Sequence, residues 1–251
     1  MTITAREAGR SHVCPPVYSV CTVVIVFRSV IALFLAALVA GCAGQPRPLT
    51  IYFIDVEGGQ STLVVTPARQ TLLIDAGFPS EGTFQSKPID PRKARDPQRI
   101  LAAARDAGVT AIDLLLVTHF HADHDGGVPE LSELLPIHMF VDHDTINADT
   151  EQNVPGSLDA FTRYEAVRTK GIHLAPNPGD RLPVDGIDAR VVSSGRATIA
   201  KPLVGGSARS AACSTPALES QEPHENPRST GVLIQYGKFR FLDVGDLAGA
   251  P

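Results

Sequence analysis

The chain contains the sequence THFHADHDGG at residues 118–127, directly after the short apolar run Ile112–Val117. Such a run is typical of a buried central strand, so we expect the polar residues after it to lie at the exit of that strand. Three histidines and one aspartate fall within six residues here, which packing in a core does not explain. Neutral imidazole and carboxylate groups are the ligands that divalent zinc takes in proteins. The stretch therefore predicts a metal site at the end of a strand.

The spacing within this stretch favours two metal positions. In a tight turn after the strand, His119 and His121 would point to one side, while Asp123 and His124 would reach a second position nearby. Two metals placed in this way would share a water molecule between them. The alternative is a cluster of surface histidines on a loop that binds no metal.

The remaining sequence alternates between strand and helix signals. Asp96 would cap a helix that has Pro97 in its first turn and ends at Gly108. An amphipathic pattern predicts a second helix over Ser157–Lys170, and the Gly-, Ser-, Ala- and Pro-rich stretch Ser193–Arg228 predicts a long loop. This order of elements indicates an α/β protein with a layered sheet. Further strands are expected at Leu49–Val56, Ser61–Thr66, Thr71–Asp75, Ile187–Val192, Thr230–Tyr236 and Phe239–Val244.

The composition is that of a globular protein without a basic surface. The 251 residues are 43% hydrophobic and 20% charged, and the formal net charge is −5. This length allows one large domain or two small ones, and this composition excludes disorder over the whole chain. A negatively charged chain lacks the field that holds nucleic acid by its phosphates, so no stable nucleic-acid complex is expected. A small phosphate-ester site built around metal ions is compatible with it.

Residues 1–41 have the pattern of a secretory signal. Most of Cys21–Gly41 is apolar, and a positive residue, Arg28, comes before a run of apolar residues and a small-residue exit. The span is also long enough for a transmembrane anchor, although a charge in its middle argues against one. The long segment before Arg28 suggests a start site assigned too early.

The end of this signal resembles a bacterial lipobox. In Val39-Ala40-Gly41-Cys42, the cysteine would be lipidated and become the first mature residue. We therefore expect an exported protein, periplasmic or attached to the membrane as a lipoprotein through Cys42. Residues 42–48 would form a tether and residues 49–251 a single domain. Cys213 would then be either a free thiol or half of a bridge whose partner is absent.

The H-x-H-x-D-H pattern of His119–His124 resembles the metallo-β-lactamase fold, an αββα sandwich with a metal site along one edge. Three other segments fit this family. Asp55–Ser61 (DVEGGQS) resembles the early strand and turn of the hydrolase-like domain in the competence protein ComEC. Leu73–Gly77 (LIDAG) resembles the superfamily's turn with a buried aspartate, and Phe241–Asp246 (FLDVGD) resembles its later strand that ends in Gly-Asp. The likeness spans roughly residues 49–249.

The resemblance implies a role for each residue of the site. His119 and His121 would bind metal one, Asp123 and His124 would bind metal two, and Asp246 would bridge both. Asp123 would also orient the hydroxide between the metals, which makes it the expected catalytic residue. Two divalent ions are implied as cofactors, zinc in the first place and manganese as the alternative.

Two further positions would support these ligands. Asp75 would accept hydrogen bonds that orient them, or would merely close its turn. Superfamily members commonly supply a third histidine to metal one from a Gly-His-Thr-Gly-like turn, and this chain has Glu225-Asn226-Pro227-Arg228-Ser229 in its place. That segment resembles the Asn/Ser segment of ComEC-like domains, so Asn226 would lie behind the ligands or bind a metal itself.

The remaining histidines are weaker candidates. His224 is either a metal ligand or an exposed loop histidine, and His143 follows a short strand near the site. His138 and His173 are expected as ordinary strand residues.

The sequence stops five residues after Asp246. The superfamily sandwich continues with further strands, helices and a late histidine, often in a His-His-Gly turn, that completes metal two. We therefore expect this chain to lack the C-terminal part of the domain, as a fragment or a truncated gene model.

These features predict an exported binuclear metal-dependent hydrolase that uses a metal-bridging hydroxide. The ComEC-like segments favour a phosphodiester or related ester, in a small molecule or a polymer, and the lipid anchor would make the membrane a partner. One alternative is a β-lactamase, against which the missing Gly-His-Thr-Gly turn argues. The other alternative is a non-catalytic metal-binding lipoprotein that keeps the ligands without turnover.

Overall fold

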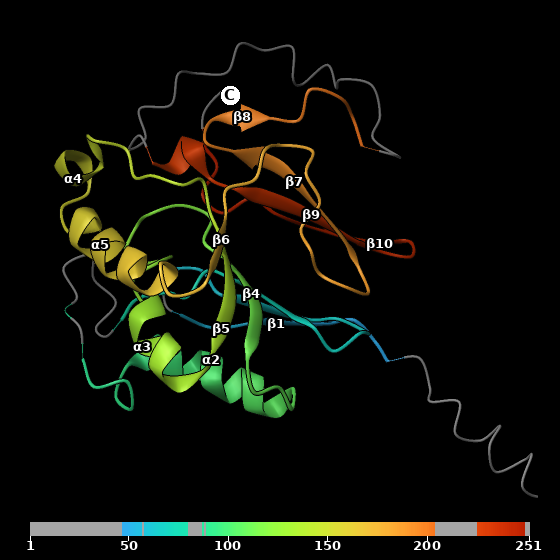
Figure 1. The fold of residues 1–251 in the computed structure, drawn as a ribbon, viewed down its shortest axis with the longest axis horizontal. Coiled ribbons are helices and arrows are strands. Elements are labelled where there is room, and N and C mark those ends of the chain that lie inside the picture. The colour runs from blue at the N-terminus through green and yellow to red at the C-terminus, as the bar shows by residue number, and fades with distance from the viewer. Residues whose placement is uncertain (1–46, 57, 80–86, 88, 204–224, 249–251) are drawn as a thin grey trace, which may run out of the picture. The chain divides into compact units, whose positions relative to one another are not determined.

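The computed structural model describes residues 47–56, 58–79, 87, 89–203 and 225–248 of the chain (Figure 1). The predicted signal, Cys42, Cys213 and His224 lie outside the described residues, so those expectations stay predictions. Within the described part of the chain, no helix is long and apolar enough to span a membrane.

The first sheet has the strand order β1-β2-β3-β4-β5-β6. Its first three strands pair in antiparallel fashion, and the pairs from β3 to β6 are parallel. Strands β2 and β3 are buried along their whole length, and β4 along most of it, because runs of Val, Leu and Ile suit a sheet covered on both faces. The strands are β1 (Thr50–Phe53), β2 (Thr62–Val65), β3 (Thr71–Ile74), β4 (Ile112–Leu116), β5 (Ile137–Val141) and β6 (Ile172–Leu174).

The second sheet has the strand order β10-β9-β7-β8 and is antiparallel throughout. Its strands are β7 (Asp188–Ser194), β8 (Ala197–Thr198), β9 (Gly231–Tyr236) and β10 (Phe239–Asp243). The register changes between Val191 and Ser193, where β7 pairs with the start of β9. Most of β7 matches the strand predicted at Ile187–Val192. The last two residues of β7 and the short strand β8 lie at the beginning of the stretch predicted as a long loop, and that part of the loop prediction is wrong.

The two sheets and the helices form layers. The helices are α2 (Arg95–Asp106), α3 (Val128–Leu134), α4 (Thr150–Asn153) and α5 (Ser157–Arg168). Figure 1 shows α2, α3 and α5 on one side of the first sheet, with the second sheet on the other side. In β4, Leu115 packs into the core under the helices, whereas Leu114 and Leu116 pack into the core between the sheets. The described residues thus form three layers of the expected αββα sandwich.

The two predicted helices are both present, but Asp96 does not cap the first. Helix α2 begins at Arg95, so Asp96 lies within its first turn, and no side chain caps the helix. The Asp96 carboxylate is fully buried, where Oδ2 accepts a hydrogen bond from the backbone N of Phe78 at 2.8 Å and Oδ1 lies 2.7 Å from Nε of Arg95. Asp96 therefore fixes the chain after β3 to the start of α2 instead of satisfying its own helix terminus.

The ends of β4 and β10 meet at Thr118. Gly245, just after β10, has a φ of 53°, and a Cβ there would lie 2.5 Å from Oγ1 of Thr118. Only glycine combines this left-handed backbone with so close an approach. The contact places Asp246 beside the turn that follows β4.

Alanine substitutions at Gly245 and Gly237 allow the cost of steric crowding to be separated from the cost of backbone strain. Gly237 has nearly the same φ, 57°, but nothing lies within 4 Å of its virtual Cβ. Gly237→Ala should lower the free energy of unfolding by about 1–2 kcal/mol because of the left-handed backbone. Gly245→Ala should cost about 1–3 kcal/mol more, because Thr118 is buried and held by hydrogen bonds. Urea denaturation of both variants measures the difference, and equal losses would contradict this account of the contact.

Candidate metal centre

The turn after β4 buries all four of its predicted ligands. His119, His121, Asp123 and His124 are each at most 7% exposed. The turn is tight, because the backbone N of His124 donates to the carbonyl of His121 at 2.8 Å. Burial of three histidines and a carboxylate together contradicts the alternative of a surface histidine cluster.

The structure brings Asp246 to this turn from the end of β10. Ligand atoms of His119, His124 and Asp246 all lie within 4.8 Å of one another. His124 Nε2 is 3.6 Å from Oδ2 of Asp123 and 3.6 Å from Oδ2 of Asp246. His119 Nε2 is 3.0 Å from Nδ1 of His121. The five predicted ligands therefore converge on one small region.

Asp75 lies directly behind this cluster and is fully buried. It follows β3 with a φ of 58°, a backbone conformation that aspartate tolerates better than most residues. Its Oδ1 accepts a hydrogen bond from the backbone N of Thr118 at 2.7 Å. Its Oδ2 lies 2.8 Å from Oγ1 of Thr118 and 2.7 Å from Nδ1 of His124. With Nδ1 engaged by the carboxylate of Asp75, the ring of His124 is held so that Nε2 faces Asp123 and Asp246.

Electrostatics keep two of the imidazoles neutral. Burial, followed by the neighbouring His124 and His121, lowers the pKa of His119 well below its usual value. Burial and His124 lower the pKa of His121 to about 4. Neutral imidazole is the form that binds a metal, so both rings are ready as ligands at neutral pH.

The pKa of His124 shifts in the opposite direction. Burial alone would lower its pKa, but the carboxylates of Asp75, Asp246 and Asp123 raise the pKa of His124 well above the usual value. The hydrogen bond with His124 lowers the pKa of Asp246, whereas burial raises the pKa of Asp123. Three carboxylates around one imidazole stabilise a positive charge at this point, which a divalent cation also satisfies.

The residues present fit a divalent metal. The Oδ1 of Asp123 is buried and has no hydrogen-bond partner among the described residues, an arrangement that is costly unless a cation or water satisfies the atom. Nitrogen from neutral histidine and oxygen from carboxylate are the donors that zinc and manganese accept.

Asn226 lies against the first pair of ligands. It begins the 3₁₀ turn Asn226–Arg228 before β9, and its amide oxygen is buried. The Asn226 side chain acts to raise the pKa values of both His119 and His121, although burial dominates. The side chain is thus placed where the resemblance puts a third ligand to metal one, and whether it binds the metal stays a prediction.

The other histidines differ from one another. His143 is buried, with Nε2 2.8 Å from Oε1 of the buried Glu225. Burial would raise the pKa of Glu225, but the hydrogen bond and charge of His143 lower it below the usual value. His138 is an exposed residue of β5, as expected. His173 lies in β6, also as expected, and its Nε2 is 2.9 Å from the buried carboxylate of Asp142.

Sequence reasoning gave no role to Thr118, Gln60 and Asp243. Thr118 is fully buried and links Asp75 to the turn, and its place beside the histidine pattern was the available signal. Nε2 of Gln60 donates to both carboxylate oxygens of Asp243, at 2.6 and 2.7 Å, and so fixes the turn after β1 to the end of β10. Only the fold could show this pair, because 183 residues separate its members.

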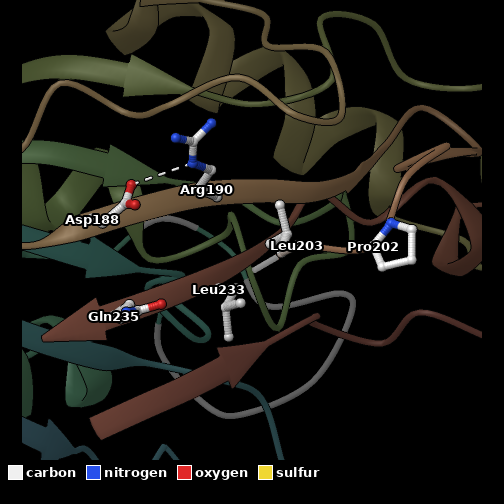
Figure 2. A pocket seen from close by; sticks show the side chains of 6 residues that line it. All are labelled: Asp188, Arg190, Pro202, Leu203, Leu233 and Gln235. Carbon is white, nitrogen blue, oxygen red and sulfur yellow. Dashed lines mark ion pairs between the residues drawn. The ribbon is translucent and has the colours of Figure 1, made fainter. Parts of the chain in front are cut away.

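One cavity lies apart from the metal centre. It lies on the outer side of β7 and β9 and has a volume of about 240 Å³. Figure 2 shows side chains that line it. Nε of Arg190 is 3.4 Å from Oδ1 of Asp188, and the alternating residues of these strands face the core between the sheets. None of the predicted site residues lines it, so we assign it no role in the chemistry.

Comparison with known proteins agrees with this geometry. The family model of the metallo-beta-lactamase superfamily matches residues 54–195. No significant match is found among curated proteins. The match identifies the superfamily and does not distinguish a ComEC-like branch within it.

Several solved structures are similar to the chain at low identity. A metallo-beta-lactamase of Cronobacter sakazakii with a HARLDQ motif is 12% identical, with 82% of this chain and 66% of that one covered and a TM-score of 0.44. The Rm3 metallo-beta-lactamase is 16% identical, with 80% and 61% covered and a TM-score of 0.44. A beta-lactamase from Chitinophaga pinensis is 16% identical, with 77% and 58% covered and a TM-score of 0.43. The chain thus spans 58% to 66% of the length of these structures.

Asp75→Asn tests the hydrogen bonds that Asp75 accepts behind the predicted ligands. An amide cannot accept the hydrogen bonds on both of its ends, so His124 would lose its fixed orientation. We expect zinc affinity to fall by about 10–100-fold, measured by competition with a chromophoric chelator.

Asp113→Asn is the matched control. Asp113 lies near the opposite end of β4, where Oδ2 accepts hydrogen bonds from the backbone N and Oγ1 of Thr71. Its loss should reduce stability without changing zinc affinity. Equal zinc affinities for wild type and Asp75→Asn would contradict the role assigned to Asp75.

Proposed function

Because the chain belongs to the metallo-beta-lactamase superfamily, whose members are typically metal-dependent hydrolases, we propose that it hydrolyses a phosphodiester or a related ester with a binuclear metal centre. The proposal concerns the substrate class and the number of metals, because the family itself is compatible with phosphodiester, carboxylic ester and lactam substrates.

The observation that carries this proposal is the buried hydrogen bond between Asp75 and His124. A carboxylate that accepts from Nδ1 of a histidine fixes the ring and its tautomer, which is the usual arrangement behind a metal-bound imidazole. Burial of the Asp75 carboxylate, even with three hydrogen-bond donors around it, costs desolvation free energy, and closing a turn does not by itself require such a residue.

The ligands would divide between two positions. His119 and His121 would hold one metal, Asp123 and His124 the other, and Asp246 would reach both. A pair of divalent metals, when bound, makes a water molecule acidic enough to lose a proton near neutral pH and stabilises negative charge on the attacked oxygen. Asp123 would accept a hydrogen bond from the nucleophile through its buried Oδ1 and orient it toward the substrate.

The net charge of the chain limits the class of substrate that we expect. With a net charge of −5, the protein as a whole repels a long polyanion, so we favour a small or flexible ester over duplex nucleic acid. The ComEC-like sequence segments support the phosphodiester choice, and Asn226 in place of a third histidine argues against a β-lactamase.

Hydrolysis of bis(p-nitrophenyl) phosphate by the full chain tests the activity. We expect turnover with zinc or manganese, loss of turnover after chelation by EDTA, and recovery when the metal is restored. Asp123→Asn should lower kcat by about 100-fold or more, whereas Asp188→Asn, on the outer face of the second sheet, should leave it unchanged.

The alternatives give different outcomes in the same assay. Hydrolysis of nitrocefin without phosphodiester hydrolysis would replace the proposal by a β-lactamase. Bound metal without hydrolysis of either substrate would replace it by a non-catalytic metal-binding protein.

We also propose that the protein is exported and lipidated at Cys42. The support is the signal pattern of residues 1–41 and the lipobox-like Val39–Cys42. Intact mass spectrometry of protein extracted from a bacterial membrane should show a chain that begins at Cys42 and carries lipid. Cys42→Ala should abolish this processing, and a wild-type mass that includes residues 1–41 would refute the proposal.

A further inference from the structure

Glu225 is a fully buried carboxylate that neither the predicted ligand set nor the proposed reaction uses. It comes immediately before Asn226 and the short turn that precedes β9. Burial of a carboxylate is costly unless its oxygens accept hydrogen bonds. The groups that contact Glu225 therefore indicate its role.

Both oxygens of Glu225 are satisfied by groups from two other segments. Oε1 lies 2.8 Å from Nε2 of His143 and accepts a long hydrogen bond, 3.4 Å, from the backbone N of Phe120. Oε2 accepts hydrogen bonds from the backbone N of Asn147 at 3.2 Å and from Oγ1 of Thr150 at 3.1 Å. One side chain thus connects the metal-binding turn, the loop after β5 and the segment before β9.

Phe120 links Glu225 to the predicted ligands. Phe120 stands between His119 and His121, and its ring packs against His143 with the centroids 4.4 Å apart. On the other side, Glu225 is the chain neighbour of Asn226, whose side chain lies near enough to both histidines to raise their pKa values. Glu225 therefore contacts the backbone that carries the first pair of ligands and also anchors the residue that packs against them.

We propose that Glu225 is a positioning residue of the metal centre, which holds the His119–His121 turn and Asn226 in register for the first metal. The inference rests on the proposed metal-dependent function. His143 acts with Glu225 as the buried partner that fixes the carboxylate, and not as a metal ligand. The loop after β5 is tied to the site through the same carboxylate, by Asn147 and Thr150.

Glu225→Gln tests the proposal because it keeps the volume and removes one acceptor. One end of the amide would present a donor to groups that themselves donate, so at least one side of the connection is lost. We expect zinc affinity of the full chain, measured by chelator competition, to fall by about 10–100-fold. The visible absorption spectrum of the cobalt-substituted protein should also shift, because the ligand geometry changes.

Glu130→Gln is the matched control. Glu130 is also a buried glutamate, and its Oε1 accepts a hydrogen bond from the backbone N of Ile89 at 3.1 Å. It lies in α3 and, among the described residues, makes no hydrogen bond or ion pair with the five predicted ligands. Its loss should change stability alone and leave zinc affinity and the cobalt spectrum as in wild type.

The outcomes separate the two proposals. If wild type binds zinc and Glu225→Gln binds it equally well with the same cobalt spectrum, the positioning role is wrong and the proposed function stands. If wild type binds no divalent metal, the proposed function fails and this inference fails with it. Should Glu225→Gln not fold, Thr150→Val removes a single donor at similar volume. A shifted cobalt spectrum in that variant supports the proposal, and an unchanged spectrum with unchanged zinc affinity overturns it.

Discussion

The carboxylate of Asp75 is the interaction on which the candidate site depends. It joins the exit of β3 to the exit of β4 through Thr118 and orients His124 at the same time. The central strands β3 and β4 pair in parallel, so their carboxyl ends lie at one edge of the sheet and deliver these groups together. Because the carboxylate is fully buried, its loss would leave three donors unsatisfied, which ties the stability of the fold to the geometry of the site.

The second sheet completes this arrangement from the other side of the core. The close approach of Gly245 to Thr118 places Asp246 at the candidate metal centre, and the pair formed by Gln60 and Asp243 holds the end of β10. The segment before β9 adds Asn226 and the buried Glu225. The site is therefore built from the ends of several strands, each fixed by a hydrogen bond or a steric contact rather than by a flexible loop.

Much of this could be predicted from local sequence, and the rest could not, for physical reasons. Periodicity and the H-x-H-x-D-H spacing predicted β4, helix α5 and the ligands of the turn, because these depend on residues close in the chain. The prediction for Asp96 was wrong, since a tertiary contact with Phe78 replaced the local cap. The partners of Glu225 and Gln60 lie 75 to 183 residues away, so only the assembled fold brings them together.

Metal content is the most direct test of the central claim, that this edge of the sheets is a binuclear metal centre. Elemental analysis of the full chain, after dialysis against metal-free buffer, would give the number of divalent ions retained by each molecule. The account predicts close to two zinc or manganese ions per chain. A chain that folds normally and retains one divalent metal ion or none would contradict it.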